Sequence, residues 1–176
     1  MTAKKVYKSK KDGTSLLSTL INDLESPKMT VKFCSLVTPY QYKNSPSVPR
    51  YSITCILCPE KDAAFLEMLH TIEKNNGVET ILKNDTIKKN GDYILTGKVV
   101  IKFQSKNFIP VFWANPDDTY SPTTLHDEID AGEEVSVIFD ILKYTKRNAL
   151  DSSEYGMSFM PTKIIFYPKE EDFGDS

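Results

Sequence analysis

The clearest pattern in the chain is the alternation of apolar and polar residues from Tyr93 to Ser105. Val99, Ile101 and Phe103 fall on one side of an extended chain, and Lys98, Lys102 and Gln104 fall on the other side. Because successive side chains of a strand point to opposite faces, this pattern predicts a half-buried strand with one polar face.

Further strands are predicted before and after this one. Apolar, aromatic and β-branched residues gather in the segments 31–37, 51–57, 108–113, 135–144 and 157–167. In the first of these segments, Val31, Phe33 and Val37 share one face. Residues 135–144 alternate little, which indicates a strand covered on both sides. Residues 38–50 contain three prolines, which forbid a regular strand and predict a loop.

Two helices are predicted. Lys61–Asn75 follows Pro59, and its apolar positions recur at helical spacing (Phe65, Leu66, Leu69 and Ile72). A second, short helix is predicted over Ser15–Glu25, where leucines and an isoleucine recur at similar spacing before Pro27. Residues 83–92 are polar and end in Asn90-Gly91-Asp92, which is a turn signal.

The order of these elements predicts a mainly β fold. One helix lies between the second and third of five or six strands, which is typical of an OB-fold-like antiparallel barrel, closed or half-open. A β-sandwich with one helix is the alternative. The predicted organisation is a basic arm and short helix (1–28), an OB-like domain (29–168) and an acidic tail (169–176).

Composition agrees with one globular domain, because the chain has 176 residues, of which 40% are hydrophobic and 26% charged. No apolar run approaches the roughly 18 residues of a membrane helix. Three cysteines in a chain without a secretion signal favour a reducing compartment over a disulfide framework. The formal net charge of −2 combines a lysine-rich N-terminal arm with acidic residues in the strap 115–134 and in the tail.

The sequence contains no positive signature of an enzyme, because phosphate-binding, dinucleotide-binding and nucleophile-elbow motifs are absent. Cys55 and Cys58 could join Cys34 and His70 around zinc, but three residues of separation on a strand turn the first two to opposite faces. Buried thiols are therefore the preferred interpretation. The strap carboxylates lack the glycine pattern of a calcium loop. We expect no metal, no cofactor and no catalysis.

Aromatic and basic residues are more informative, because several of them occur together outside the expected core. Cations can follow phosphates while rings stack on bases at about 1–3 kcal/mol each, which is how proteins hold unpaired nucleic acid without reading its sequence. Trp113 is a further stacking candidate. The residues expected to bind nucleic acid are Tyr40, Tyr42, Arg50, Tyr51, Lys98, Lys102, Lys143, Tyr144, Lys146 and Arg147.

Short motifs in a fixed order carry a resemblance. They are Pro49-Arg50-Tyr51-Ser52, Leu57-Cys58-Pro59-Glu60-Lys61-Asp62, Gly97-Lys98, Pro110-Val111, Asp130-Ala131-Gly132, Tyr155-Gly156-Met157 and an acidic tail containing Phe173. Over residues 29–176 the chain resembles the short OB-fold single-stranded DNA-binding proteins of tailed bacteriophages. Members of that family commonly end with the aromatic residue, whereas three residues follow Phe173 here.

The resemblance implies a sequence-tolerant protein that coats and protects single-stranded DNA during phage DNA replication and recombination, in the cytoplasm of the bacterial host. It implies that the tail meets replication proteins such as a polymerase or helicase and competes for the basic groove. The tail residues concerned are Glu170, Glu171, Asp172, Phe173 and Asp175. A homodimer is a candidate assembly. The alternatives are a structural or interaction β-protein of the virion that binds no nucleic acid, and a metal-dependent nuclease using the strap carboxylates.

Overall fold

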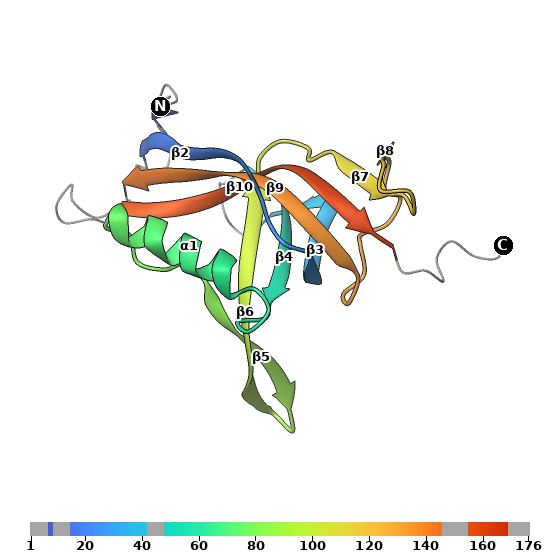
Figure 1. Cartoon of the computed structure of the whole chain (residues 1–176), viewed down its shortest axis with the longest axis horizontal. Helices are drawn as coiled ribbons and strands as arrows, with labels where there is room; N and C mark the ends of the chain where they lie inside the picture. The colour runs from blue at the N-terminus through green and yellow to red at the C-terminus, as the bar shows by residue number, and fades with distance from the viewer. Residues whose placement is uncertain (1–6, 9–14, 42–47, 146–154, 169–176) are drawn as a thin grey trace.

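The computed structural model describes residues 7–8, 15–41, 48–145 and 155–168. Within these ranges the chain forms ten strands and one helix (Figure 1). The elements are β1 (Tyr7–Lys8), β2 (Ser15–Glu25), β3 (Met29–Tyr40), β4 (Arg50–Leu57), α1 (Ala63–Asn75), β5 (Lys83–Lys89), β6 (Asp92–Ser105), β7 (Val111–Ala114), β8 (Tyr120–Thr123), β9 (Glu134–Thr145) and β10 (Tyr155–Tyr167).

The strands form one sheet that curls into a partly open barrel. Its hydrogen-bonded path runs β5-β6-β4-β3-β9-β10-β7-β8, and β2 pairs with β9 beside this path. All pairings are antiparallel except that between β7 and β10. Pro110 lies in the segment that connects β6 to β7, and its carbonyl accepts a hydrogen bond from Ile164 N–H of β10 at 3.0 Å. β10 therefore lies close to the end of β6, at the opposite end of the strand order. The predicted OB-like β fold is confirmed.

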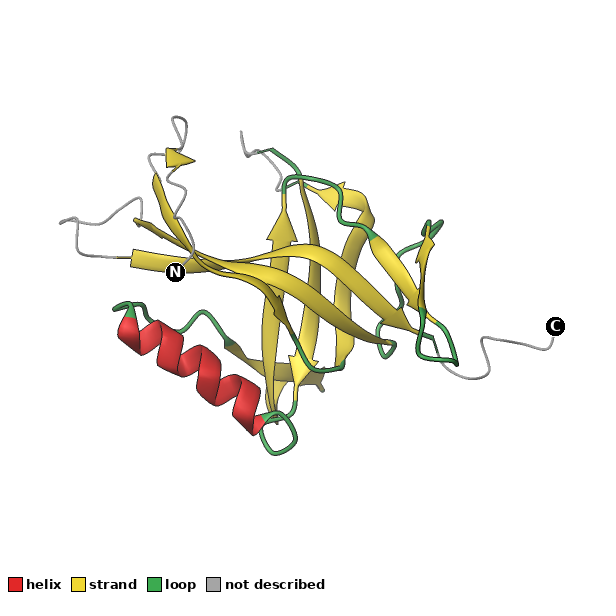
Figure 2. Cartoon of the chain, turned by 45° about the horizontal axis from the view of Figure 1, so that its top comes forward, coloured by secondary structure: helices red, strands yellow, loops and turns green. Residues whose placement is uncertain are grey.

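Three phenylalanines from different strands occupy the centre of the barrel. Phe103 of β6, Phe139 of β9 and Phe159 of β10 are buried, with ring centroids 4.8–6.1 Å apart. The predicted helix between the second and third barrel strands is also confirmed, and α1 lies alongside β9 and β10 (Figure 2). Phe65 of α1 packs edge-on against Phe139, which fixes the helix to this core.

The predicted helix over Ser15–Glu25 is wrong, because this segment is strand β2. It pairs with β9, and the pairing register shifts three times, between Leu16 and Ser18, Thr19 and Ile21, and Ile21 and Leu24. Each irregularity interrupts the two-residue alternation. The apolar residues therefore recur at intervals that imitate a helix, while backbone pairing with β9 decides the conformation.

Two polar segments also contain strands that the sequence analysis did not predict. Residues 83–89 form β5, and residues 120–123 of the acidic strap form β8. Asn90 and Gly91 both have positive φ angles, 52° and 86°, as the tight turn between β5 and β6 requires. The hairpin of β5 and β6 projects from the barrel (Figure 1).

Candidate nucleic-acid interface

One side of the sheet formed by β3, β4, β5 and β6 faces away from the core, and we call it the outer face. Ile53, Cys55 and Leu57 of β4 point into the core, so the residues between them point outward. The pairing registers place their neighbours in cross-strand rows. The rows are Thr30–Ile56–Val100–Lys83, Phe33–Thr54–Lys102, Ser35–Ser52–Gln104 and Tyr40–Arg50.

A β-bulge at Lys32 turns Phe33 onto the outer face. Val31 pairs with Cys55 while Phe33 pairs with Thr54, so Lys32 is the extra residue. As a result Val31 is buried, whereas Phe33 is 65% exposed. The sequence prediction that the two residues share a face is therefore wrong, because the inserted residue reverses the alternation.

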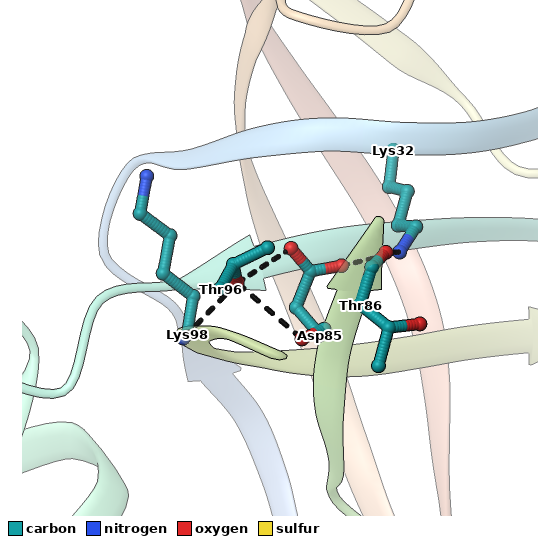
Figure 3. A network of polar contacts seen from close by, with 5 residues as sticks. All are labelled: Lys32, Asp85, Thr86, Thr96 and Lys98. Atoms are coloured by element: carbon teal, nitrogen blue, oxygen red, sulfur yellow. Dashed lines mark hydrogen bonds and ion pairs between the residues drawn. The ribbon is translucent and has the colours of Figure 1, made fainter. Parts of the chain in front are cut away.

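Lys32 connects the outer face of β3 to the β5–β6 hairpin (Figure 3). Its ammonium forms an ion pair with the buried carboxylate of Asp85 and donates to the carbonyl of Thr86 at 3.1 Å. Thr96 donates its hydroxyl proton to the other oxygen of Asp85 at 2.9 Å. Since β4 and β6 lie between β3 and β5 in the sheet, this contact requires the sheet to curl around the outer face.

Asp85 is ionised in this network. Burial by itself raises the pKa of the Asp85 carboxyl, but the hydrogen bonds from Lys32 and Thr96 outweigh it and hold that pKa below its usual value. The pair consequently fixes the hairpin with a charge-assisted contact.

At the far end of β3, a carboxylate from the acidic strap replaces strand pairing. The register between β3 and β4 stops at Ser35 and resumes at Tyr40. In between, the backbone N–H groups of Leu36, Val37 and Thr38 all donate to Glu128, at 2.5–3.1 Å. Burial raises the pKa of Glu128, but these three donors outweigh it and lower the pKa overall. Such a concavity of successive N–H groups is a typical anion site.

Three predicted binding residues share the outer face. Lys102 is exposed on β6 and shares a cross-strand row with Phe33, with Thr54 of β4 between them. Tyr40 is 56% exposed and lies opposite Arg50 in the register, so both side chains are on the same side. Lys98 is exposed beside Gly97, where a φ of +84° and a register irregularity mark the base of the hairpin.

Tyr51 lies on the opposite side of the sheet. It alternates with Arg50, packs against the core and contacts Phe108 edge-on with ring centroids 5.9 Å apart. Phe108 itself is 64% exposed. Tyr51 is therefore a half-buried residue at the barrel end, and Phe108 is the ring in this pair that reaches solvent.

Lys143 and Tyr144 lie on a different part of the molecule. β9 meets β3 only at residues 134 and 135, and Lys143 is eight residues further along, roughly 26 Å at about 3.3 Å per residue. The ammonium of Lys143 lies 4.2 Å from the ring centroid of Tyr155. The ring of Tyr144 lies over Gly156, where a Cβ atom would come within 2.5 Å of it.

The remaining predicted residues fall outside the described ranges. They are Tyr42, Lys146 and Arg147, together with the tail residues Glu170, Glu171, Asp172, Phe173 and Asp175. Trp113 is described, and packs on Phe166 of β10 with centroids 5.3 Å apart, away from the outer face.

The described residues contain no group of three or more side chains that could hold a metal ion. Cys55 is buried, Cys34 and Cys58 are partly buried, and His70 contacts Glu73 at 2.8 Å. Burial raises the pKa of the Cys34 thiol to about 12 and raises that of Cys55 as well. Of the described helices, none is long and apolar enough to span a membrane.

Comparison with known proteins supports this architecture. No protein-family model matches the chain, and no curated protein matches it in sequence. The C-terminally truncated single-stranded DNA-binding protein from bacteriophage Enc34 is similar in structure, with a TM-score of 0.63 and 16% identity over 97% of this chain and 99% of that one. The chain shares its fold with phage proteins. That Enc34 protein in complex with single-stranded DNA gives a TM-score of 0.62 at 17% identity, over 98% of this chain and 100% of the other.

A second phage structure has the same fold. The single-stranded DNA-binding protein gp2.5 encoded by bacteriophage T7 gives a TM-score of 0.56 at 12% identity, over 87% of this chain and 95% of that one. These likenesses extend over most of each chain and show a shared fold.

Sequence reasoning missed Lys32, Phe33 and the hairpin. Nothing in the residues 31–37 marks where a bulge occurs, so the reversal at Phe33 was not visible. The hairpin did leave a signal, because Asn-Gly between Ile87 and Ile94 is a strong two-residue turn sequence. The polar composition of residues 83–89 concealed it.

Proposed function

We propose that this protein binds single-stranded DNA with little regard to sequence, on the outer face of β4 and β6. OB folds bind oligonucleotides on the face of their second and third strands, which here are β4 and β6. The observation that supports the proposal most is the exposed ring of Phe33 in one cross-strand row with Lys102, on that face. The likeness to a phage protein in complex with single-stranded DNA supports the same function.

The chemistry of the outer face suits an unpaired strand. The rings of Phe33 and Tyr40 offer stacking surfaces that accept any base, because every base has a π-face. Lys102 and Arg50 supply positive charge for the phosphates. Thr54 and Ser52 between them are small, so a base can approach the sheet closely.

The loops that flank this face in OB folds extend the proposal to residues outside the described ranges. In this chain the loop between the first two barrel strands contains Tyr42, and the loop between the last two contains Lys146 and Arg147. Lys143 and Tyr144 stand at the base of the second loop. We assign all five to the DNA contact, with Lys143 and Tyr144 as a second contact region separate from the outer face.

The proposal also covers the C-terminal residues 169–176 and the biological process in which the protein acts. The four acids of this tail imitate the charge of phosphates, so it would compete with DNA for cationic residues and offer basic partners a contact. The biological role is the coating and protection of unpaired strands in phage DNA replication and recombination, in the cytoplasm of the bacterial host. Replication proteins are the proposed partners of the tail.

Replacing the exposed ring tests the proposed face. Phe33→Ala should weaken binding to fluorescent oligo(dT), measured by anisotropy, by roughly 5- to 150-fold, since one stacked ring contributes about 1–3 kcal/mol. The matched control is Tyr120→Ala, because Tyr120 is 52% exposed on β8, far along the sheet from β4 and β6.

Equal affinities for wild type, Phe33→Ala and Tyr120→Ala would exclude the outer face as the stacking surface. Absence of oligo(dT) binding in the wild type would favour the alternative of an interaction β-protein.

A further inference from the structure

The β5–β6 hairpin exposes an unusual amount of apolar side chain. Of its large hydrophobic residues, Ile87 is 53%, Tyr93 73%, Ile94 44% and Leu95 65% exposed. A projecting two-stranded ribbon has no core of its own and is marginally stable in water. These side chains are therefore better explained by a binding role than by stability.

The two sides of the hairpin differ in what they face. Ile87 pairs with Ile94, and alternation puts both on the side that carries Asp85 and Thr96, which we call the clamp side. Lys83 pairs with Val100, which belongs to the outer face. Lys83, Asp85 and Ile87 are two residues apart along β5, so their side chains point to the same side of the strand. The clamp side of the hairpin therefore continues the outer face. Tyr93, Leu95 and Lys88 form the opposite, back side.

The ion pair between Lys32 and Asp85 holds the clamp side toward the proposed DNA surface. Lys32 is adjacent to Phe33 at the bulge, and its ammonium lies 5.6 Å from the centroid of the Phe33 ring. The same ammonium contacts Asp85 on β5. Figure 3 shows Lys32 reaching Asp85 of β5, which also accepts from Thr96 of β6, so the strand that carries Phe33 is tied to the hairpin that carries the two isoleucines.

Charge identifies the class of ligand that fits the hairpin. Lys83, Lys88, Lys89 and Lys98 are exposed on it or at its base, whereas its acids are Asp92 and the already paired Asp85. Apolar surface combined with excess positive charge matches an unpaired nucleic acid strand, whose bases are apolar on their faces and whose phosphates are negative.

We propose that the clamp side of the β5–β6 hairpin is an extension of the single-stranded DNA surface, on which Ile87 and Ile94 contact bases and Lys83 and Lys89 contact phosphates. This inference rests on the proposed function and adds a second contact region to it. The strand that crosses Phe33 and Lys102 continues over the row of Ile56 and Val100 and onto the hairpin.

The test compares the two sides of the hairpin. The double variant Ile87→Ala/Ile94→Ala should weaken binding of a long oligo(dT), of about 16 nucleotides, by about 5- to 30-fold. The control Tyr93→Ala/Leu95→Ala removes a similar apolar area from the back side and should leave the affinity within twofold. All four residues are exposed, so neither variant threatens the core.

Two further measurements separate this inference from its alternatives. With an oligo(dT) of about 5 nucleotides, which the barrel face alone can accommodate, the clamp-side variant should match the wild type. Lys83→Ala should flatten the salt dependence for the long oligonucleotide, whereas the isoleucine variant should leave that slope unchanged.

An unchanged affinity in the clamp-side variant, while Phe33→Ala still weakens binding, overturns the inference and leaves the proposed function standing. A wild type that binds no oligo(dT) overturns both. If the clamp-side variant instead changes only the mass of the protein in light scattering, the hairpin binds a second copy and the inference is wrong.

Discussion

At the scale of single residues, two carboxylates determine how the outer face is held. Asp85 and Glu128 both come from polar segments that a sequence presents as solvated. Asp85 accepts from Lys32 of distant β3 and from Thr96 of its own hairpin, and Glu128 accepts from three backbone N–H groups of β3. Asp85 joins β5 to β3, and Glu128 joins the acidic strap to the end of β3. The carboxylates thus act at both ends of the surface that we assign to DNA.

Glu128→Gln should destabilise the protein by about 1 kcal/mol at pH 7, because a neutral amide accepts more weakly from the three N–H groups and the partly exposed site is screened by water. The free energy of unfolding, from urea denaturation, measures this loss. Asp127→Asn is the matched control, since Asp127 is the exposed neighbour.

The stability difference between wild type and Glu128→Gln should depend on pH. Because folding lowers the pKa of Glu128 below the ordinary 4.5, its ionised form stabilises the fold above that pH. This contribution is lost as the pH falls through the folded pKa, so the two proteins should converge in acid. A difference that stays constant from pH 7 to pH 3 would contradict the assigned role.

At the scale of elements, strands with regular alternation were predictable and strands with bulges were not. β6 and β4 have clean two-residue patterns, and Lys61–Asn75 has a helical one, so their types and approximate limits followed from the residues. β2 and the bulge at Lys32 did not follow, because register shifts are set by pairing with β9 and β4. Lys102 was therefore predictable as an outer-face residue, whereas Phe33 was not, and Arg50 was expected in the loop 38–50 rather than on a strand.

The tail is the element whose role is most directly testable by removal. Deleting residues 169–176 removes four acids and one lysine. If the tail competes with phosphates for the cationic residues, the truncated protein should bind oligo(dT) several-fold more tightly at low salt, and the advantage should shrink as salt rises. Anisotropy titrations of both proteins measure this. Unchanged or weaker binding after truncation would show that the tail does not compete.

At the scale of the whole molecule, the outer face gathers Lys83, Lys102 and Arg50 with the exposed rings of Phe33 and Tyr40. The chain is nearly neutral overall, with 22 basic and 24 acidic residues, so net charge does not indicate a DNA ligand. The proposed site rests instead on where the charges lie, because Lys83, Lys102 and Arg50 lie on the outer face while Glu128 is engaged at its margin. Binding would thus depend on local charge, which salt screens.

The salt dependence of oligo(dT) binding by the wild type tests the central claim most directly. The account predicts micromolar or tighter binding at low salt and a log–log slope of about −0.7 for each cation that contacts a phosphate, with Lys102→Ala reducing the slope by about 0.7. Lys74→Ala, which changes an exposed lysine in the last turn of α1 rather than on the sheet, should leave the slope unchanged. Absent binding, or binding that salt does not weaken, would contradict the account.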